Sequence, residues 1–353
     1  MSQVSSEDVG QISTPRPADR QEAAAVNVPH RASVKPRWGT VVGLLRSGIV
    51  LGTFVAMIVA FSVLKEHSFL TTATLDNILD QSVVPAVLAS GLTLVLASGE
   101  FDLSFGATLS LGAGFVVVLM VNHGANPALA TALTLVGSAV AGLVIGVVVA
   151  YGRASAFIVT LAFSSVFAGL EIGLTGNKTI YQGVPASFTQ ISSDTFLGRK
   201  YPVWLAVIVI VVVGVLLHGT RFGRHVQAIG ENESAAYIAG VRVARVKIIA
   251  FAVLALLAGL SSLVLTSRAS SYYPGSAGTY MLNTYAAVFL GVAANRHGRF
   301  SVGGSMLGVL WLVTLQSGLA QVNVASWLTN LVEGLVLGLA VLIARSPHSR
   351  ART

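Results

Sequence analysis

The sequence predicts an all-α integral membrane protein with about ten transmembrane helices. Of its 353 residues, 54% are hydrophobic and only 10% are charged, whereas about 25% of the residues in a soluble domain are charged. The mean hydropathy is +0.77, and the apolar residues gather in runs of about 20, the length at which an α-helix crosses ~30 Å of hydrocarbon. The net charge of +8 comes from basic residues between these runs, which argues against a nucleic-acid-binding surface.

Both ends of the chain are predicted to be polar cytoplasmic tails around one transmembrane domain, residues 39–346. Residues 1–38 are rich in Ser, Pro and Ala and have no periodic apolar face. They lack the surface whose burial offsets ordering entropy, so they are predicted to be disordered. The first apolar run starts only near Val41, so it is interpreted as a retained helix rather than a secretory signal. Residues 347–353 form the second tail.

Ten apolar runs are interpreted as membrane spans. The eighth is short and is expected to be tilted, half-buried or re-entrant inside the bundle. Two glycine pairs, Gly142 with Gly146 and Gly334 with Gly338, are expected to serve close packing inside the bundle rather than dimerisation. The spans are residues 41–64, 82–98, 104–121, 128–150, 157–175, 202–219, 247–267, 280–294, 302–320 and 328–345.

Basic residues predict the orientation, because cytoplasmic loops carry an excess of Lys and Arg. With the N-terminus inside, few of the 22 basic residues fall outside, and an even number of spans places both termini in the cytoplasm. Tyr201, Trp204 and Trp327 begin spans at the predicted outer surface, as interfacial aromatic residues do. The basic residues left outside are Lys65, Lys178, Arg199, Lys200 and Arg268.

The longest predicted inside loop, residues 220–246, contains a short helix signal. After Gly230, the residues Glu231, Asn232 and Glu233 supply a cap and first-turn acids, and Gly240 supplies a helix terminator. Between them lies a small apolar stretch, Ala235, Ala236, Tyr237, Ile238 and Ala239.

Such a helix either docks a cytoplasmic partner or lies on the bilayer surface, where Arg221, Arg224 and Arg242 would hold it. The sequence contains no Walker A motif, because none of its five lysines follows a glycine as G-x-x-x-x-G-K-[ST] requires. If transport is driven by ATP, another chain must bind the ATP.

Three blocks of the sequence resemble the permease subunits of bacterial ribose, xylose and galactose-type ABC importers. The first block is the loop from Arg221 to Lys247. The second is residues 91–111, which are similar to that family's second and third spans with their TGGIDLSVG-like turn and read GLTLVLASGEFDLSFGATLSL. The third is residues 280–308. With the span count, the resemblance covers about residues 40 to 345. The matching residues in the second and third blocks are Gly99, Asp102, Leu103, Ser104, Gly106, Ala286, Ala287, Leu290, Gly291, Gly298, Arg299, Gly304 and Gly308.

The resemblance implies a permease bundle in the bacterial inner membrane that imports a monosaccharide or a related polyol. It implies three partners: a cytoplasmic ABC ATPase, a periplasmic or lipid-anchored solute-binding protein, and a second permease copy or paralogue. The chain itself is expected to do no covalent chemistry and to need no cofactor, since the ATPase binds ATP. The residues that would form the family's coupling helix are Gly230, Glu231, Asn232, Ala235, Ala236, Tyr237 and Gly240.

Carboxylates inside predicted spans are candidates for the translocation path, because each costs several kcal/mol unless it faces protein or water. Asp102 is favoured as the N-cap of the third span over a direct solute contact. Glu171 and Glu333 lie in the outer parts of their spans, where they either line a water-filled path or reach the interface and pair with basic residues. Glu100, where the family usually has glycine, is expected at the inner interface. The path candidates are Asp102, Glu171, Glu333, Tyr280 at the end of the outer loop 269–280, and the polar residues inside spans Thr160, Ser164, Ser165, Asn283, Thr284 and Gln316.

Other functions stay open at this point. A nucleoside, an amino acid or a signalling sugar is the alternative solute, since relatives of similar architecture carry those. A proton-coupled secondary transporter using Asp102, Glu171 or Glu333 is a different class, and the capped loop helix argues against it. A membrane enzyme is the weakest alternative, because no catalytic set stands out. The seven histidines lack the spacing of metal ligands, and the chain has no cysteine, so no metal site is predicted.

Overall fold

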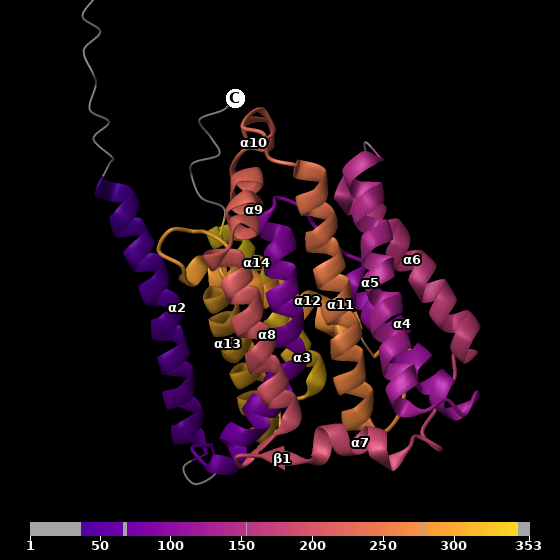
Figure 1. The fold of residues 1–353 in the computed structure, drawn as a ribbon. Coiled ribbons are helices and arrows are strands. Elements are labelled where there is room, and N and C mark those ends of the chain that lie inside the picture. Colours follow the sequence, from indigo (N-terminus) through magenta and orange to yellow (C-terminus); the bar gives the residue numbers. More distant parts are fainter. Residues whose placement is uncertain (1–36, 66–68, 153, 277, 345–353) are drawn as a thin grey trace, which may run out of the picture. The chain divides into compact units, whose positions relative to one another are not determined.

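Every predicted span coincides with an α-helix in the computed structural model, which describes residues 37–65, 69–152, 154–276 and 278–344 (Figure 1). The chain divides into two units, Met1–Gly39 and Thr40–Thr353. The first is described only where α2 begins, so the predicted N-terminal tail lies almost wholly outside the described residues, as does the tail at 347–353. The helices at the ten spans are α2 (Arg37–Leu64), α3 (Thr72–Ala97), α4 (Phe105–Val121), α5 (Pro127–Tyr151), α6 (Ala156–Thr175), α8 (Tyr201–Gly219), α11 (Val243–Ala269), α12 (Gly278–Ala294), α13 (Val302–Gln321) and α14 (Ser326–Ala344).

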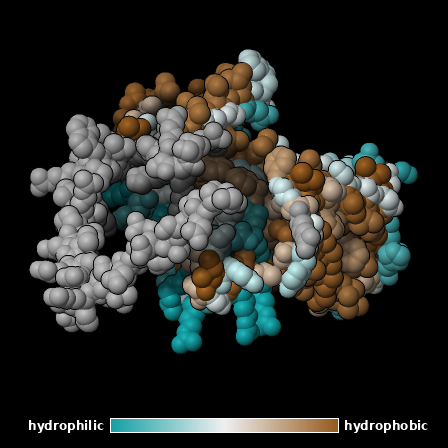
Figure 2. Space-filling model, turned by 90° about the horizontal axis from the view of Figure 1, so that it is seen from above, coloured by the Kyte–Doolittle hydropathy of each residue, from teal (hydrophilic) through white to brown (hydrophobic). Residues whose placement is uncertain are grey.

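Six helices, α3, α5, α6, α8, α11 and α13, are long and apolar enough to cross a membrane. Large apolar side chains are exposed along α5 and α6, for example Val136, Val140 and Ile158. They belong to the flank at the right of Figure 1, where Figure 2 shows a largely apolar surface. An exposed apolar surface of this kind is expected to contact lipid or another apolar surface. The all-α membrane fold is therefore confirmed, whereas ten crossings and two cytoplasmic termini stay predictions.

Helix α11 is packed against α3, α4 and α5. The approach of α5 depends on glycine: a Cβ at Gly142 would lie 2.5 Å from the Ala255 Cβ, and one at Gly146 would lie 2.8 Å from the α11 backbone. The expected internal packing is confirmed for this pair. It is wrong for Gly334 and Gly338, because both are exposed and a Cβ added at either meets nothing within 4 Å.

The second predicted span begins earlier than expected, at Thr72 instead of residue 82. The Thr71 side chain caps this helix by accepting a hydrogen bond from a first-turn backbone N–H over 3.2 Å. Two acids in the early turns then find basic partners: Asp76 pairs with Arg199, and the Asp80 carboxylate lies 2.5 Å from the Lys200 ammonium. Because these turns contain polar residues, they do not belong to a continuous apolar run, and the predicted span excluded them.

Two ends of the bundle carry short elements that the span analysis did not include. At one, the α7 end, helix α7 (Ala186–Ser193) precedes an antiparallel hairpin of β1 (Thr195–Phe196) and β2 (Arg199–Lys200). At the other, the α10 end, α9 (Arg221–Glu231) is followed by α10 (Glu233–Ile238). Figure 1 shows the α10 end at the top and the α7 end at the bottom.

The short eighth span is α12, whose side chains from Thr284 to Val288 and from Leu290 to Ala293 are buried. It packs against α3, α13 and α14. Its contact with α13 is close, since a Cβ at Gly291 would lie 2.4 Å from the Gly304 backbone. The short length of α12 predicted burial inside the bundle, and this prediction is confirmed. The first half of α12 lies beside the cavity described below.

Candidate translocation and coupling sites

The loop expected to dock a partner contains a short capped helix at the α10 end. The Asn232 side-chain oxygen accepts a hydrogen bond from the Ala235 backbone N–H over 3.0 Å. Gly240 follows α10 with φ of +82°, a left-handed conformation that favours glycine. Tyr237 and Ile238 are 73% and 85% exposed. The helix therefore presents an apolar pair outside the bundle.

Two of the predicted docking residues belong to the preceding helix instead. Asn232 has an extended backbone that separates α9 from α10, so Glu231 ends α9 and is not a first-turn acid of α10. Its carboxylate lies 2.5 Å from the Arg299 guanidinium. Gly230 lies where α9 meets the end of α3, and a Cβ there would lie 2.1 Å from the carbonyl oxygen of Ala97. Gly230 thus serves close packing, while Ala236 is the buried residue of α10.

A buried lysine joins α10 to the bundle. The Lys247 ammonium on α11 lies 2.9 Å from a carboxylate oxygen of Glu233, the first residue of α10. It also lies 2.6 Å from a carboxylate oxygen of Glu100, in the turn between α3 and α4. Lys247 is only 7% exposed, and a buried cation is tolerated when such partners offset its desolvation. One ammonium group therefore connects α10, α11 and this turn.

The same turn, residues 98–104, is hydrogen-bonded to α12. The Tyr285 hydroxyl donates to the Asp102 carbonyl oxygen over 2.6 Å and accepts from the Asp102 N–H over 3.1 Å. The Asp102 carboxylate accepts from the backbone N–H and the hydroxyl of Ser104 over 2.6 and 2.5 Å. Thr160 on α6 accepts from the Leu103 N–H over 3.0 Å. The N-cap residue of α4 is Ser104 and not, as predicted, Asp102. Asp102 and Thr160, two path candidates, are instead buried groups that hold the turn.

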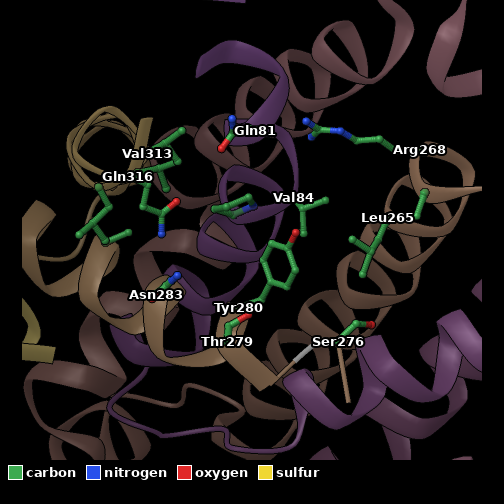
Figure 3. A pocket seen from close by; sticks show the side chains of 15 residues that line it. Gln81, Val84, Leu265, Arg268, Ser276, Thr279, Tyr280, Asn283, Val313 and Gln316 are labelled. Carbon is green, nitrogen blue, oxygen red and sulfur yellow. The ribbon is translucent and has the colours of Figure 1, made fainter. Parts of the chain in front are cut away.

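A cavity of about 610 Å³ lies between α3, α11, α12 and α13 (Figure 3). Its lining residues Arg268 and Ala269 at the end of α11 place it nearer the α7 end. Two path candidates, Tyr280 and Asn283, line it from adjacent turns of α12. Amide groups reach it from three helices, on Gln81, Asn283 and Gln316. Hydroxyl groups reach it from Ser276, Thr279 and Tyr280. The cavity thus combines uncharged hydrogen-bonding groups with apolar walls, as solute sites in proteins do.

Among the described residues that line the cavity, one is basic and none is acidic. Arg268, at the end of α11, donates a hydrogen bond to the carbonyl oxygen of Asp80 over 3.0 Å. Arg268 was predicted at the outer surface and Gln81 before the second span, so neither was a predicted site residue. A signal for this face was present in α12, where Tyr280, Asn283 and Ala287 follow the spacing of one helix face.

Glu333 is not a lining residue, but it contacts one. Its carboxylate accepts a hydrogen bond from the Gln316 Nε2 over 2.7 Å. Glu333 is 9% exposed, on α14, and Gln316 lines the cavity from α13. The acid therefore lies directly behind the cavity wall.

Glu171 anchors a segment at the α7 end and is not among the lining residues. Its Oε1 accepts hydrogen bonds from the Ser110 hydroxyl over 2.6 Å, the Tyr272 hydroxyl over 2.5 Å and the Gly275 N–H over 3.4 Å. Burial is the main cause that raises the pKa of Tyr272 above its ordinary value, and the hydrogen bond to Glu171 raises it further. The Tyr272 hydroxyl therefore stays protonated and acts as a donor. The carboxylate ties residues 270–276 to α4 and α6.

Comparisons with known proteins show that the chain is similar to transport proteins. The family model described as branched-chain amino acid transport system / permease component matches residues 74–341. The ribose import permease RbsC of Bacillus subtilis is 38% identical over 299 residues, which are 84% of this chain and 92% of that protein. The L-arabinose ABC transporter permease AraH of Azospirillum brasilense is 31% identical over 321 residues, 91% of this chain and 94% of that protein.

A third relative transports a different solute. The autoinducer 2 import system permease LsrC of Salmonella choleraesuis is 32% identical over 279 residues, 79% of each chain. No solved structure matches the chain.

Proposed function

The chain belongs to the permease components of the branched-chain amino acid transport system family, and we propose that it is the membrane-spanning permease of an ATP-driven ABC importer for a monosaccharide. The observation that carries the choice of solute is the cavity with its amides and hydroxyls. Ribose and L-arabinose appear in the names of relatives that match over most of this chain.

The cavity favours an uncharged, hydroxylated solute over an amino acid. An amino acid brings an ammonium group whose burial is best offset by an anion, and no described lining residue is Asp or Glu. Amide and hydroxyl groups can both donate to and accept from sugar hydroxyls. The ring of Tyr280 adds an aromatic surface of the kind that covers a sugar ring.

The α10 end is the site that supports docking of the ATPase. Exposed apolar side chains that are surrounded by polar residues are typical of interaction surfaces. Tyr237 and Ile238 are two exposed apolar side chains of this kind. A displacement of α10 by the ATPase reaches the turn at residues 98–104 through Glu233, Lys247 and Glu100. Under this proposal, α10 lies in the cytoplasm.

The remaining partners follow from the same assignment. A solute-binding protein delivers the solute at the α7 end, and a second permease copy or paralogue completes the membrane unit in the bacterial inner membrane. The chain performs no covalent chemistry and binds no cofactor, because the ATPase subunit holds the ATP.

Co-purification with the co-encoded ATPase tests this function. The wild-type chain in mild detergent is expected to retain the ATPase, and Tyr237→Asp is expected to lose it, because a charge is placed in the apolar contact. Gly240→Pro is expected to do the same, because proline cannot adopt the φ of +82° found there. Tyr181→Asp is the matched control: Tyr181 is 67% exposed and lies outside the α10 end. Retention of the ATPase by both α10 variants would contradict the docking assignment.

A further inference from the structure

A buried carboxylate on α14 holds a side chain of the cavity wall. Gln316 extends from α13 toward the cavity that Tyr280 and Asn283 line from α12 (Figure 3). The Gln316 Nε2 donates to the Glu333 Oε1 over 2.7 Å, and Glu333 is 9% exposed. Glu333 therefore touches the solute site only through Gln316.

The chemistry of this contact fixes which end of the amide is available. A carboxylate accepts hydrogen bonds and does not donate them, whereas an amide has a donor end and an acceptor end. The nitrogen of Gln316 must therefore face Glu333. In the described part of the chain, no hydrogen bond reaches the Gln316 Oε1, so this oxygen is left to the cavity.

Asn283 provides a contrast in the same cavity. Within the described residues its side chain makes no hydrogen bond, so its amide can rotate and present either end to a solute. Gln316 cannot rotate without placing two acceptors, its own oxygen and the carboxylate, against each other. The cavity thus has one amide of fixed polarity and one that is adjustable.

We propose that Glu333 is a positioning residue for solute specificity: it holds the Gln316 amide so that the Gln316 oxygen accepts a hydrogen bond from one hydroxyl of the solute. The proposal rests on the proposed function, because it requires a hydroxylated solute. A solute without that hydroxyl leaves the fixed acceptor unpaired, which is a strong basis for rejecting it. Glu333 acts through Gln316 and does not contact the solute.

The test measures discrimination between a sugar and its deoxy analogues. The complex with the co-encoded ATPase and binding protein is reconstituted in liposomes, and uptake of D-ribose, D-xylose, D-galactose and L-arabinose is measured. For a sugar that the wild type takes up, the uptake ratio of the sugar to each monodeoxy analogue is then compared between variants. The binding protein is the same throughout, so a change in the ratio arises in the permease.

Glu333→Gln frees the Gln316 amide to rotate. It is expected to reduce the ratio about tenfold for one analogue only, with an unchanged rate of ATP hydrolysis. The double variant Gln316→Glu with Glu333→Gln restores a fixed acceptor facing the cavity and is expected to recover the ratio. Ser317→Ala, at a buried neighbour on α13 that does not line the cavity, is the matched control and is expected to keep it.

Three results would overturn the proposal. In the first, Glu333→Gln discriminates as the wild type does. In the second, it slows the sugar and all analogues equally, which is the effect of a purely structural role. Both leave the proposed function standing. In the third, the wild type takes up none of the sugars, and this removes the proposed function as well. If Glu333→Gln does not assemble with the ATPase, Gln316→Met, which removes the acceptor, must show the same loss for one analogue.

Discussion

The Lys247 ammonium lies 2.6 Å from a carboxylate oxygen of Glu100, and this pair joins the two predicted sites. On one side, Lys247 also binds Glu233 of α10. On the other, the turn that contains Glu100 is hydrogen-bonded through Asp102 to Tyr285 of α12, the helix that lines the cavity. A displacement of α10 is therefore expected to reach the cavity through direct contacts.

Glu100→Gln is expected to uncouple transport. The substitution weakens the contact between Lys247 and the turn but leaves the pair of Lys247 with Glu233 in place. ATP hydrolysis and ATPase binding should persist, while uptake falls about tenfold, as expected for loss of 1 to 2 kcal/mol of coupling. Uptake and hydrolysis are measured together in proteoliposomes. Arg299→Gln, which removes the exposed pair with Glu231, is the control and should retain coupling; equal loss in both variants would remove the special role of Glu100.

Tyr285→Phe is expected to destabilise the turn at residues 98–104. The change removes the hydroxyl that pairs with both the N–H and the carbonyl of Asp102, and leaves these buried groups without that partner. The free energy of unfolding should fall by about 1 to 3 kcal/mol. A thermal unfolding curve in detergent measures the shift, and hydrogen exchange should quicken in residues 98–104. Unchanged exchange there would show that the two hydrogen bonds do not hold the turn.

Glu171→Gln is expected to loosen residues 270–276 at the α7 end. The three donors on Glu171 would then face a neutral acceptor, and charged hydrogen bonds are about twice as strong as neutral ones. Hydrogen exchange in 270–276 is expected to rise, with little change elsewhere. Lys178→Gln, at an exposed residue near this end, should leave exchange as in the wild type. If Glu171→Gln instead alters sugar selectivity with unchanged exchange, Glu171 acts in the path and not as an anchor.

Gly142→Ala is expected to destabilise the contact of α5 with α11. The new Cβ would lie 2.7 Å from the Phe251 carbonyl oxygen, and overpacking of this kind costs about 1 to 3 kcal/mol. Gly137→Ala on the same helix has nothing within 4 Å of its new Cβ, so its melting temperature should stay close to the wild type. Equal melting temperatures for both variants would argue against close packing at Gly142.

The sequence predicted most of the fold, because hydrophobic length is a local property. All ten spans coincide with helices, and the cap at Asn232 and the turn at Gly240 were visible as residue types. The hairpin after α7 and the early turns of α3 were missed, because their polar residues are held by pairing between distant segments, such as Asp80 with Lys200.

The site was less predictable for the same reason. Asn283 and Gln316 were selected because they are polar within a span, and Tyr280 because it ends an outer loop; all three line the cavity. Glu171 and Glu333 were selected as buried acids, but their partners Tyr272 and Gln316 come from other helices or loops. Contacts between helices determine which side chains line the cavity and which lie behind its wall. A single sequence does not reveal these contacts.

Sugar uptake by the reconstituted complex under two energy sources tests ATP-driven import most directly. Liposomes contain this chain, the co-encoded ATPase and the binding protein, and uptake of a labelled pentose is followed with ATP or with a proton gradient alone. Uptake is expected to require hydrolysable ATP and to stop when the ATPase is omitted. Uptake by this chain alone that collapses with the proton gradient would contradict this expectation and would identify a secondary transporter.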